Sequence, residues 1–287
     1  MQIRALLVLC GLLAALSGLP GCANVLNATT SQAGYTVQSD LRYGEGRRND
    51  YDLYIPNNAG PKTPVVVFFH GGGWDTGNKD QYLFVGQSLA SAGVIVAVPN
   101  YRLYPSVKFP DFVEDGAKAV AAITRTVTNG QAGVPAGRHP IFLMGHSAGA
   151  HIAALLNYDE RYLKAVGTSN RRISGFIGLA GPYDFLPITY PRFRQIFPVP
   201  LWEQSQPINF VGGGEPAALI INGDADTTVV PRNAQSLADT VKRKGGRAEL
   251  KIYPGFGHLK VLSALSTRLS GDSDIRETIL AFIRHHS

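Results

Sequence analysis

Cysteine is scarce in this sequence, which contains only Cys10 and Cys22 among its 287 residues. A framework of several disulfides is therefore excluded, and so is a zinc site built from pairs of cysteines. Histidine, aspartate and glutamate do not occur at metal-ligand spacing either. Neither a G-x-G-x-x-G motif nor a phosphate-binding P-loop follows a strand pattern. We expect no metal and no cofactor.

Charge is also sparse, since charged residues make up 17% of the sequence, with 27 Lys and Arg against 21 Asp and Glu. The basic residues form only short clusters, such as Arg47-Arg48 and Arg171-Arg172, and no basic stripe is interleaved with aromatic residues. A nucleic-acid partner is therefore not expected. Hydrophobic residues, at 45%, suffice for one sizeable core. No internal repeat is present, so we expect one globular domain.

The N-terminus has the features of an export signal. Arg4 supplies a positive start, residues 5–16 form an apolar run, and residues 17–21 are small or turn-forming. The apolar run is too short to span a bilayer comfortably. We therefore predict that residues 1–21 are a signal peptide.

Cys22 extends this prediction, because Leu19-Pro20-Gly21-Cys22 resembles the lipobox of bacterial lipoproteins. The resemblance implies an exported protein held at a membrane by lipid on Cys22, facing the periplasm or the cell surface. Lipidation would also account for the single cysteine that remains after cleavage. Ordinary signal-peptidase cleavage nearby and an uncleaved anchor are the alternatives. Residues 22–34 are small and polar, which predicts a tether before a domain at 35–287.

Short β-rich runs alternate with helical patterns along this domain. Several of the runs are continuously apolar, which is typical of parallel strands that helices cover on both faces. Helical spacing recurs at 112–126, 233–244 and 275–285. The order predicts an α/β fold with a mostly parallel central sheet. The expected strands are 51–55, 65–69, 94–98, 141–144, 173–179, 217–221 and 250–253.

One stretch breaks the alternation of strands and helices. Residues 182–214 contain six prolines and many aromatic residues, with neither a helical nor a strand period. This composition predicts a lid or cap inserted into the sheet domain.

The strongest chemical motif is Gly145-His146-Ser147-Ala148-Gly149, which fits the nucleophile-elbow pattern G-x-S-x-G. It stands between an expected strand and a small-residue helix, as that pattern requires. A turn this sharp leaves little space, so small residues flank the serine. The serine hydroxyl then projects into a crevice at the ends of the strands. The helix that follows aims N-terminal amides at a bound acyl oxygen, and Ala148 N–H is one expected oxyanion donor.

A second glycine-rich motif, His70-Gly71-Gly72-Gly73-Trp74, ends the expected strand at 65–69. Glycines let backbone N–H groups approach a substrate oxygen without steric interference. We expect Gly71 and Gly72 to be oxyanion donors, and His70 to orient the loop by a hydrogen bond rather than act as a base.

An acid and a histidine follow in the chain order that a nucleophile elbow demands. Asp224 and Asp226 both follow the expected strand 217–221, and either could be the acid. His258 follows the strand 250–253 and is the expected base. A neutral imidazole would take the serine proton and return it to the leaving group, while a buried carboxylate fixes its tautomer.

These motifs together resemble the BD-FAE-like and hormone-sensitive-lipase-like branch of the α/β-hydrolases, from Tyr51 to the C-terminus. The segment Tyr101-Arg102-Leu103 and Asp115 resemble further parts of that pattern, whereas Asn100 and His146 depart from the Asp usual at both places. The elbow sequence is especially similar to isoprenylcysteine-methylesterase-like and kynurenine-formamidase-like relatives. By this resemblance the triad is Ser147, Asp226 and His258, with Gly71, Gly72 and Ala148 as oxyanion donors.

The resemblance implies a carboxylesterase that cleaves a small or medium ester, such as an acetyl or feruloyl group on a polysaccharide. An amidase of the arylformamidase type could use the same triad. A binding protein of the same fold without catalysis is the third alternative, because fold alone does not establish function.

Overall fold

The computed structural model describes residues 25–28, 30–31, 33–269, 271 and 273–287. The predicted signal peptide and Cys22 lie outside these residues. A sheet of eight strands runs through the molecule in the order β1-β2-β4-β3-β5-β6-β7-β8. The pairs β1–β2 and β2–β4 are antiparallel, and every other neighbouring pair is parallel. The strands are β1 (Tyr35–Arg42), β2 (Asp50–Pro56), β3 (Val65–Phe69), β4 (Ile95–Pro99), β5 (Ile141–His146), β6 (Ile173–Leu179), β7 (Ala217–Gly223) and β8 (Ala248–Tyr253).

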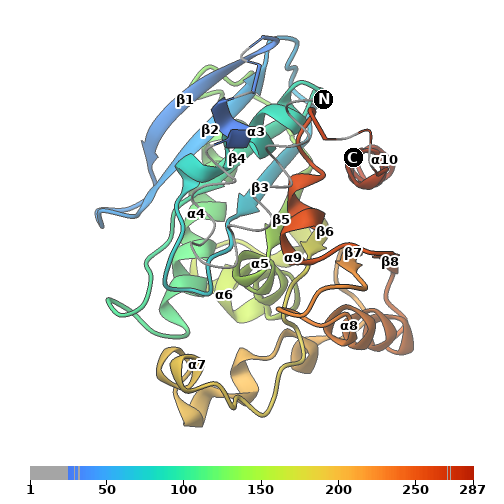
Figure 1. Cartoon of the computed structure of the whole chain (residues 1–287). Coiled ribbons are helices and arrows are strands. Elements are labelled where there is room, and N and C mark those ends of the chain that lie inside the picture. The colour runs from blue at the N-terminus through green and yellow to red at the C-terminus, as the bar shows by residue number, and fades with distance from the viewer. Residues whose placement is uncertain (1–24, 29, 32, 270, 272) are drawn as a thin grey trace.

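Helices cover both faces of this sheet (Figure 1). Strands β2 to β5 and β7 are buried along their whole length, and the apolar runs of β3, β4 and β7 are typical of such burial. One core cluster packs the sheet against α4 (Asp111–Thr128), α5 (Ala148–Tyr158), α6 (Glu160–Ala165) and α8 (Arg232–Arg243). The other cluster packs the opposite face against α3 (Leu83–Ala90), α9 (His258–Ser263) and α10 (Ile275–His285). The predicted α/β fold is confirmed.

The segment predicted as a cap lies between β6 and β7. It consists of α7 (Pro191–Ile196) and three short 3₁₀ helices, η3 (Val199–Leu201), η4 (Glu203–Ser205) and η5 (Pro207–Phe210). Figure 1 shows it in yellow below α5 and α6, at one end of the molecule. Its aromatic residues account for the missing period, because Phe185, Phe193 and Phe197 all pack against Trp74 rather than along one helix face.

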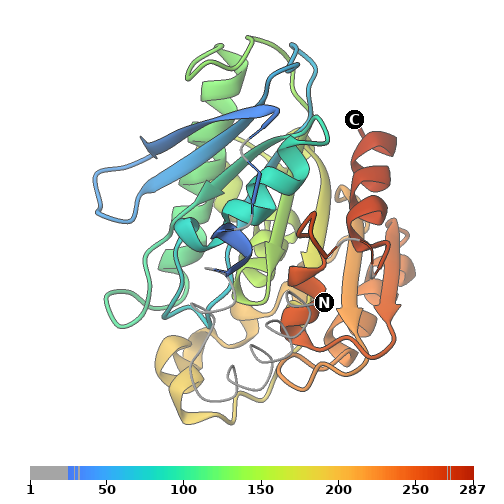
Figure 2. The same cartoon turned by 45° about the horizontal axis from the view of Figure 1, so that its top comes forward.

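Part of the expected tether packs on the domain. Leu26 is buried in the second core cluster. The Asn27 side chain donates to the Asp80 carbonyl at 2.8 Å and accepts from the Phe84 N–H at 3.1 Å. The packed body therefore includes residues before Tyr35, as Figure 2 shows for the short blue helix beside the sheet. Among the described residues, no helix combines the length and the apolar character needed to cross a bilayer.

Candidate active site

Ser147 stands at the junction of β5 and α5, with φ 55° and ψ −125°. This conformation is unusual for a residue with a side chain and typically costs ~1–3 kcal/mol. Two glycines make the turn possible. A Cβ on Gly149 would collide with the Phe69 carbonyl, and one on Gly145 would collide with the Gly149 backbone. The motif residues are therefore required by close packing between β3, β5 and α5.

Ser147, His258 and Asp226 form a continuous hydrogen-bonded chain. The Ser147 Oγ lies 2.9 Å from the His258 Nε2, and the His258 Nδ1 lies 2.8 Å from the Asp226 Oδ2. Because a carboxylate only accepts, Nδ1 carries the proton and donates to Asp226. The unprotonated Nε2 therefore faces the serine hydroxyl. The structure thus brings together three residues predicted from separate parts of the sequence.

Backbone groups of its own loop hold the Asp226 side chain in place. Its side chain is fully buried, and its Oδ1 accepts from the N–H groups of Thr228 and Val229, each at 2.9 Å. Asp224, the alternative acid, is exposed, and its Oδ1 instead accepts from the Gly255 N–H at 2.6 Å. Only Asp226 therefore reaches His258.

The loops that carry Asp226 and His258 are tied to each other. The Asp224 N–H donates to the Tyr253 carbonyl, and the Ala225 N–H donates to the Phe256 carbonyl, both at 3.1 Å. A side chain on Gly223 would collide with the same Phe256 carbonyl. These contacts hold the ends of the neighbouring parallel strands β7 and β8 at a fixed separation.

The glycine loop after β3 lies against the nucleophile. A Cβ on Gly71 would stand 3.2 Å from the Ser147 Cβ, so a larger residue would crowd the serine. The carbonyl groups of this loop are held by the domain, because Tyr101 Oη donates to His70 O and Thr76 Oγ1 donates to Gly72 O. In a trans peptide the N–H of the next residue points in the direction opposite to the carbonyl. The anchored carbonyls of His70 and Gly72 therefore also fix the directions of the Gly71 and Gly73 N–H groups. No described atom accepts from the N–H groups of Gly72, Gly73 or Ala148. The Gly71 N–H, in contrast, faces the hydroxyl of the buried Tyr82.

Comparison with known proteins identifies the family of this chain. A family model described as BD-FAE matches residues 51–241, which is more than half of the chain. The chain belongs to the BD-FAE family. This match bears out the α/β-hydrolase resemblance found in the sequence.

The BD-FAE chain is similar to proteins named as esterases and as formamidases. It is 31% identical to a probable isoprenylcysteine alpha-carbonyl methylesterase of Arabidopsis thaliana, over 77% of this chain and 51% of that protein. It is 28% identical to the kynurenine formamidase of Danio rerio, over 58% of this chain and 53% of that protein. The chain thus spans about half the length of these curated relatives. Esterase B from Lactobacillus rhamnosis shares the fold, with a TM-score of 0.78, 18% identity and 96% of each chain covered.

His70 orients the glycine loop of the BD-FAE chain, as expected. Its ring stacks on Tyr101 with 4.3 Å between centroids, and its Nδ1 donates to the Gly71 carbonyl at 2.8 Å. Burial lowers the pKa of His70 to about 3, so the ring is neutral at ordinary pH. Its Nε2 faces the Arg48 guanidinium at 3.5 Å. Both ring nitrogens of His70 therefore face groups other than the serine hydroxyl.

His146 packs against His258. Its ring lies 4.7 Å from the His258 ring, and its Nε2 lies 3.1 Å from the His258 carbonyl, to which it donates. Burial, and then the charge of a protonated His258, lower the pKa of His146 well below its ordinary value. An uncharged His146 can therefore hold the His258 backbone without repelling the imidazolium. An aspartate at this position could not donate this bond at neutral pH.

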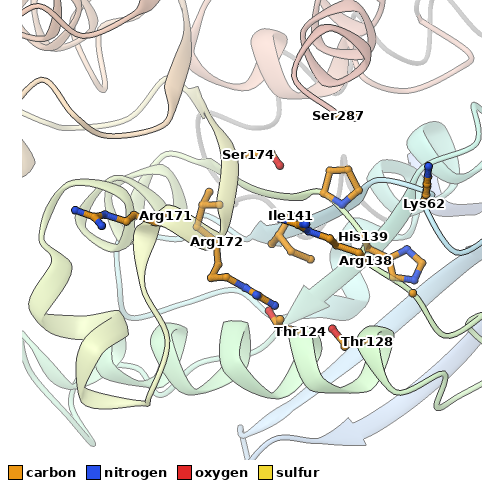
Figure 3. A pocket seen from close by; sticks show the side chains of 13 residues that line it. Lys62, Thr124, Thr128, Arg138, His139, Ile141, Arg171, Arg172, Ser174 and Ser287 are labelled. Carbon is orange, nitrogen blue, oxygen red and sulfur yellow. The ribbon is translucent and has the colours of Figure 1, made fainter.

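A separate cavity of about 920 Å³ lies far from these residues (Figure 3). Its lining includes Ile141 and Ile173, the first residues of β5 and β6, whereas Ser147 follows the last residue of β5. The cavity therefore opens at the opposite edge of the sheet. Within the described part of the chain, no group of three or more His, Cys, Asp or Glu side chains could hold a metal ion.

Sequence reasoning left out two residues near the nucleophile. Gly73 has a free N–H and the same carbonyl anchoring as its neighbours, which makes it a third candidate donor beside Gly71 and Gly72. The other is His151, which is fully buried one turn after Ser147. The repeated glycines could have signalled Gly73, whereas the partners of His151 lie on distant segments.

Proposed function

We propose that this BD-FAE chain is a carboxylic ester hydrolase in which Ser147 is the nucleophile, His258 the general base and Asp226 the acid of the triad. The hydrogen-bonded chain from Ser147 Oγ through His258 to Asp226 is the observation that carries the proposal. Its atoms already have the protonation states that acyl transfer needs. The names of the methylesterase relatives support the same reaction class.

The reaction proceeds by two acyl transfers. His258 Nε2 removes the proton of Ser147 Oγ while that oxygen attacks the ester carbonyl carbon. The imidazolium then gives the proton to the departing alkoxide, which leaves an acyl group on Ser147. Water then attacks the acyl group while the same nitrogen takes its proton. The imidazolium returns that proton to Ser147 Oγ as the bond to the acyl carbon breaks, which releases the carboxylic acid. Asp226 stabilises the imidazolium in both halves without taking its proton.

Backbone N–H groups stabilise the charge on the carbonyl oxygen. The Ala148 N–H belongs to the first residue of α5, and those of Gly71 to Gly73 belong to the loop after β3. Losing one such donor typically slows turnover about 10²–10³-fold, because the charge develops mainly in the transition state. The loop therefore serves catalysis through its backbone.

A second candidate reaction is hydrolysis of an arylformamide by the same residues. The kynurenine formamidases among the relatives favour it. An amide nitrogen leaves only when it is protonated, and His258 can supply that proton as it does for an alcohol. We place the ester first, with a small or medium acyl group, because the formamidase matches are either shorter than the methylesterase matches or only 23% identical.

Initial rates on 4-nitrophenyl esters from acetate to palmitate, and on N-formylkynurenine, test both reactions. We expect ester turnover in the purified wild type and a loss of at least about a thousandfold in Ser147→Ala. Turnover of the formamide alone would replace the esterase by the amidase. No serine-dependent turnover of either would favour a binding protein without catalysis.

Export and anchoring complete the proposal. Residues 1–21 serve as a signal peptide, and Cys22 receives the lipid that attaches the protein to a membrane of the bacterial envelope. The support is the lipobox-like sequence before Cys22. Growth of an expressing bacterium with labelled palmitate should label the wild type and leave Cys22→Ala unlabelled. Label on both proteins, or on neither, would contradict the anchor at Cys22.

A further inference from the structure

His151 lies at a junction of three segments around the nucleophile. It stands on α5, and its backbone N–H donates to the Ser147 carbonyl at 3.1 Å. Its ring is completely buried. The Trp74 Nε1 lies 3.3 Å from the His151 Nδ1, and the Ser205 carbonyl lies 2.7 Å from the His151 Nε2. The ring therefore connects the nucleophile helix to the glycine loop on one side and to the cap on the other.

The two partners fix the protons on this ring. An indole N–H can only donate, so the His151 Nδ1 must be the acceptor and carry no proton. A backbone carbonyl can only accept, so the Nε2 must carry the proton. His151 is thus a neutral ring with a single tautomer, and neither bond can form if the proton moves to Nδ1.

Trp74 needs such an anchor because its backbone is strained. It has φ 63°, in the left-handed region that side chains disfavour, and it directly follows Gly73 of the glycine loop. Strained residues persist only where their surroundings hold them. Besides His151, the Tyr104 N–H donates to the Trp74 carbonyl at 2.9 Å, and Phe197 packs edge-on against the indole at 4.8 Å.

The cap end of the junction is equally well held. The Ser205 Oγ donates to the Trp202 carbonyl at 2.6 Å and accepts from the Gln206 Nε2 at 2.8 Å. The Gln206 Oε1 accepts from the Phe185 N–H at 2.8 Å. Ser205 and Gln206 are both buried. The carbonyl that His151 binds therefore belongs to a rigid part of the cap.

We propose that His151 is a positioning residue that sets the glycine loop relative to Ser147 through the Trp74 indole and locks the cap to the same helix. The inference rests on the proposed function. The ring does not touch the reacting atoms, and its effect on turnover passes through the oxyanion donors next to Trp74. The donors of Gly71 to Gly73 and the nucleophile then move as one unit.

Two single variants and their combination test this proposal. Trp74→Phe removes the indole donor together with part of the packed ring, and His151→Phe removes both ring hydrogen bonds while keeping an aromatic ring. We expect each to lower kcat by about 10–100-fold with little change in KM, because misplaced donors weaken only transition-state binding. The affinity for a trifluoromethyl ketone, which forms the oxyanion, should fall in parallel. The double variant should lose no more than His151→Phe alone.

Tyr51→Phe is the matched control. Tyr51 belongs to the same core cluster as Trp74, and its hydroxyl shares a partly buried hydrogen bond with Thr126 Oγ1 at 3.0 Å, which the substitution removes. We expect Tyr51→Phe to lower the melting temperature without lowering kcat. A comparable kcat loss in the control, or additive losses in the double variant, would overturn the positioning role. If His151→Phe fails to fold, the comparison of kcat between Trp74→Phe and Tyr51→Phe decides whether the positioning role holds.

A spectroscopic measurement separates this proposal from the proposed function. In ¹⁵N-histidine-labelled protein at neutral pH, the two buried rings of His146 and His151 should carry their proton on Nε2 alone, and only the His151 Nδ1 signal should shift in Trp74→Phe. A proton on Nδ1 of His151 would overturn the junction even in an active enzyme. If the wild type turns over no ester or formamide, the proposed function fails, and the ring tautomer still decides whether the junction exists.

Discussion

Asp224 and Asp226 stand two residues apart in opposite surroundings. Asp226 is buried, receives two backbone N–H groups and faces His258. Asp224 is exposed and holds only the Gly255 N–H. A carboxylate can fix the tautomer of the base only from the first position. The two residues have the same side chain, so they differ only in where the fold places them.

This contrast gives a prediction at the two aspartates. Asp226→Ala should lower kcat by about 10³–10⁴-fold, because the His258 tautomer and imidazolium lose their support. Asp224→Ala should lower kcat less than about tenfold and mainly loosen the loop at Gly255, since one exposed hydrogen bond contributes only ~1 kcal/mol. Steady-state kinetics on the preferred ester compares them. Equal losses at the two positions would contradict the assignment of the acid.

The sequence alone could not choose between these aspartates. Strand and motif order limited the acid to Asp224 or Asp226, and only the family resemblance favoured Asp226. What separates them is the packing of their loop on the segment after β8, where Ala225 binds the Phe256 carbonyl. Contacts between residues about thirty positions apart leave no pattern in the local sequence. The oxyanion roles of Gly71, Gly72 and Ala148 stay predictions, which rest on short motifs.

At the scale of elements, the buried strands were the most predictable. β3 and β6 have the expected bounds, and α10 spans the expected 275–285. β1 was not expected, because its burial pattern leaves most of Tyr35–Arg42 exposed and its sequence has no continuous apolar run. An edge strand that pairs only with β2 needs no apolar face on both sides.

A buried charge cluster also escaped prediction. The Lys79 ammonium is 5% exposed and lies 2.8 Å from the Asp52 carboxylate and 2.7 Å from the Asp40 carboxylate. Burial lowers the pKa of Lys79, but the bonds from Asp40 and Asp52 raise it overall, so the side chain stays charged. The cluster fastens the β1–β2 hairpin to the short helix η1 (Lys79–Tyr82). Its members come from three separate segments, so no spacing reveals it.

The pattern Tyr101-Arg102-Leu103 with Asp115 has a comparable structural basis. The Arg102 guanidinium binds the Asp115 carboxylate through two nitrogens, at 2.7 and 2.8 Å. Asp115 is buried, so the pair joins the segment after β4 to α4. Such bidentate pairs fix orientation as well as distance. These residues therefore support the site without entering it.

For the whole molecule, strand order assembles the site. β3, β5, β7 and β8 are parallel, and β5 is separated from β7 only by β6, so their carboxyl ends lie along one edge of the sheet. The glycine loop, Ser147, Asp226 and His258 follow these four strands. A parallel sheet with this chain order therefore brings together residues from positions 71 to 258. The cap, whose composition gave no period, could be predicted only as an interruption.

Three buried neutral histidines give the fold a dependence on pH. Burial lowers the pKa of His70 to about 3 and that of His151 to about 4, and it holds the pKa of His146 well below its ordinary value. In the unfolded chain each pKa returns to about 6.5. As the pH falls below that value, the unfolded chain binds protons that the native state does not. The free energy of unfolding must therefore decrease with falling pH.

Between about pH 6 and pH 5 we expect these histidines to give a slope that approaches ~4 kcal/mol per pH unit, since each contributes up to ~1.4. Urea unfolding across this window measures the slope. His151→Phe should reduce it by up to ~1.4 kcal/mol per pH unit, whereas Tyr51→Phe, which removes no histidine, should leave it nearly unchanged. An unaltered slope in His151→Phe would mean that His151 is protonated in the folded protein. That state would also break its bond to Trp74, because Nδ1 could no longer accept.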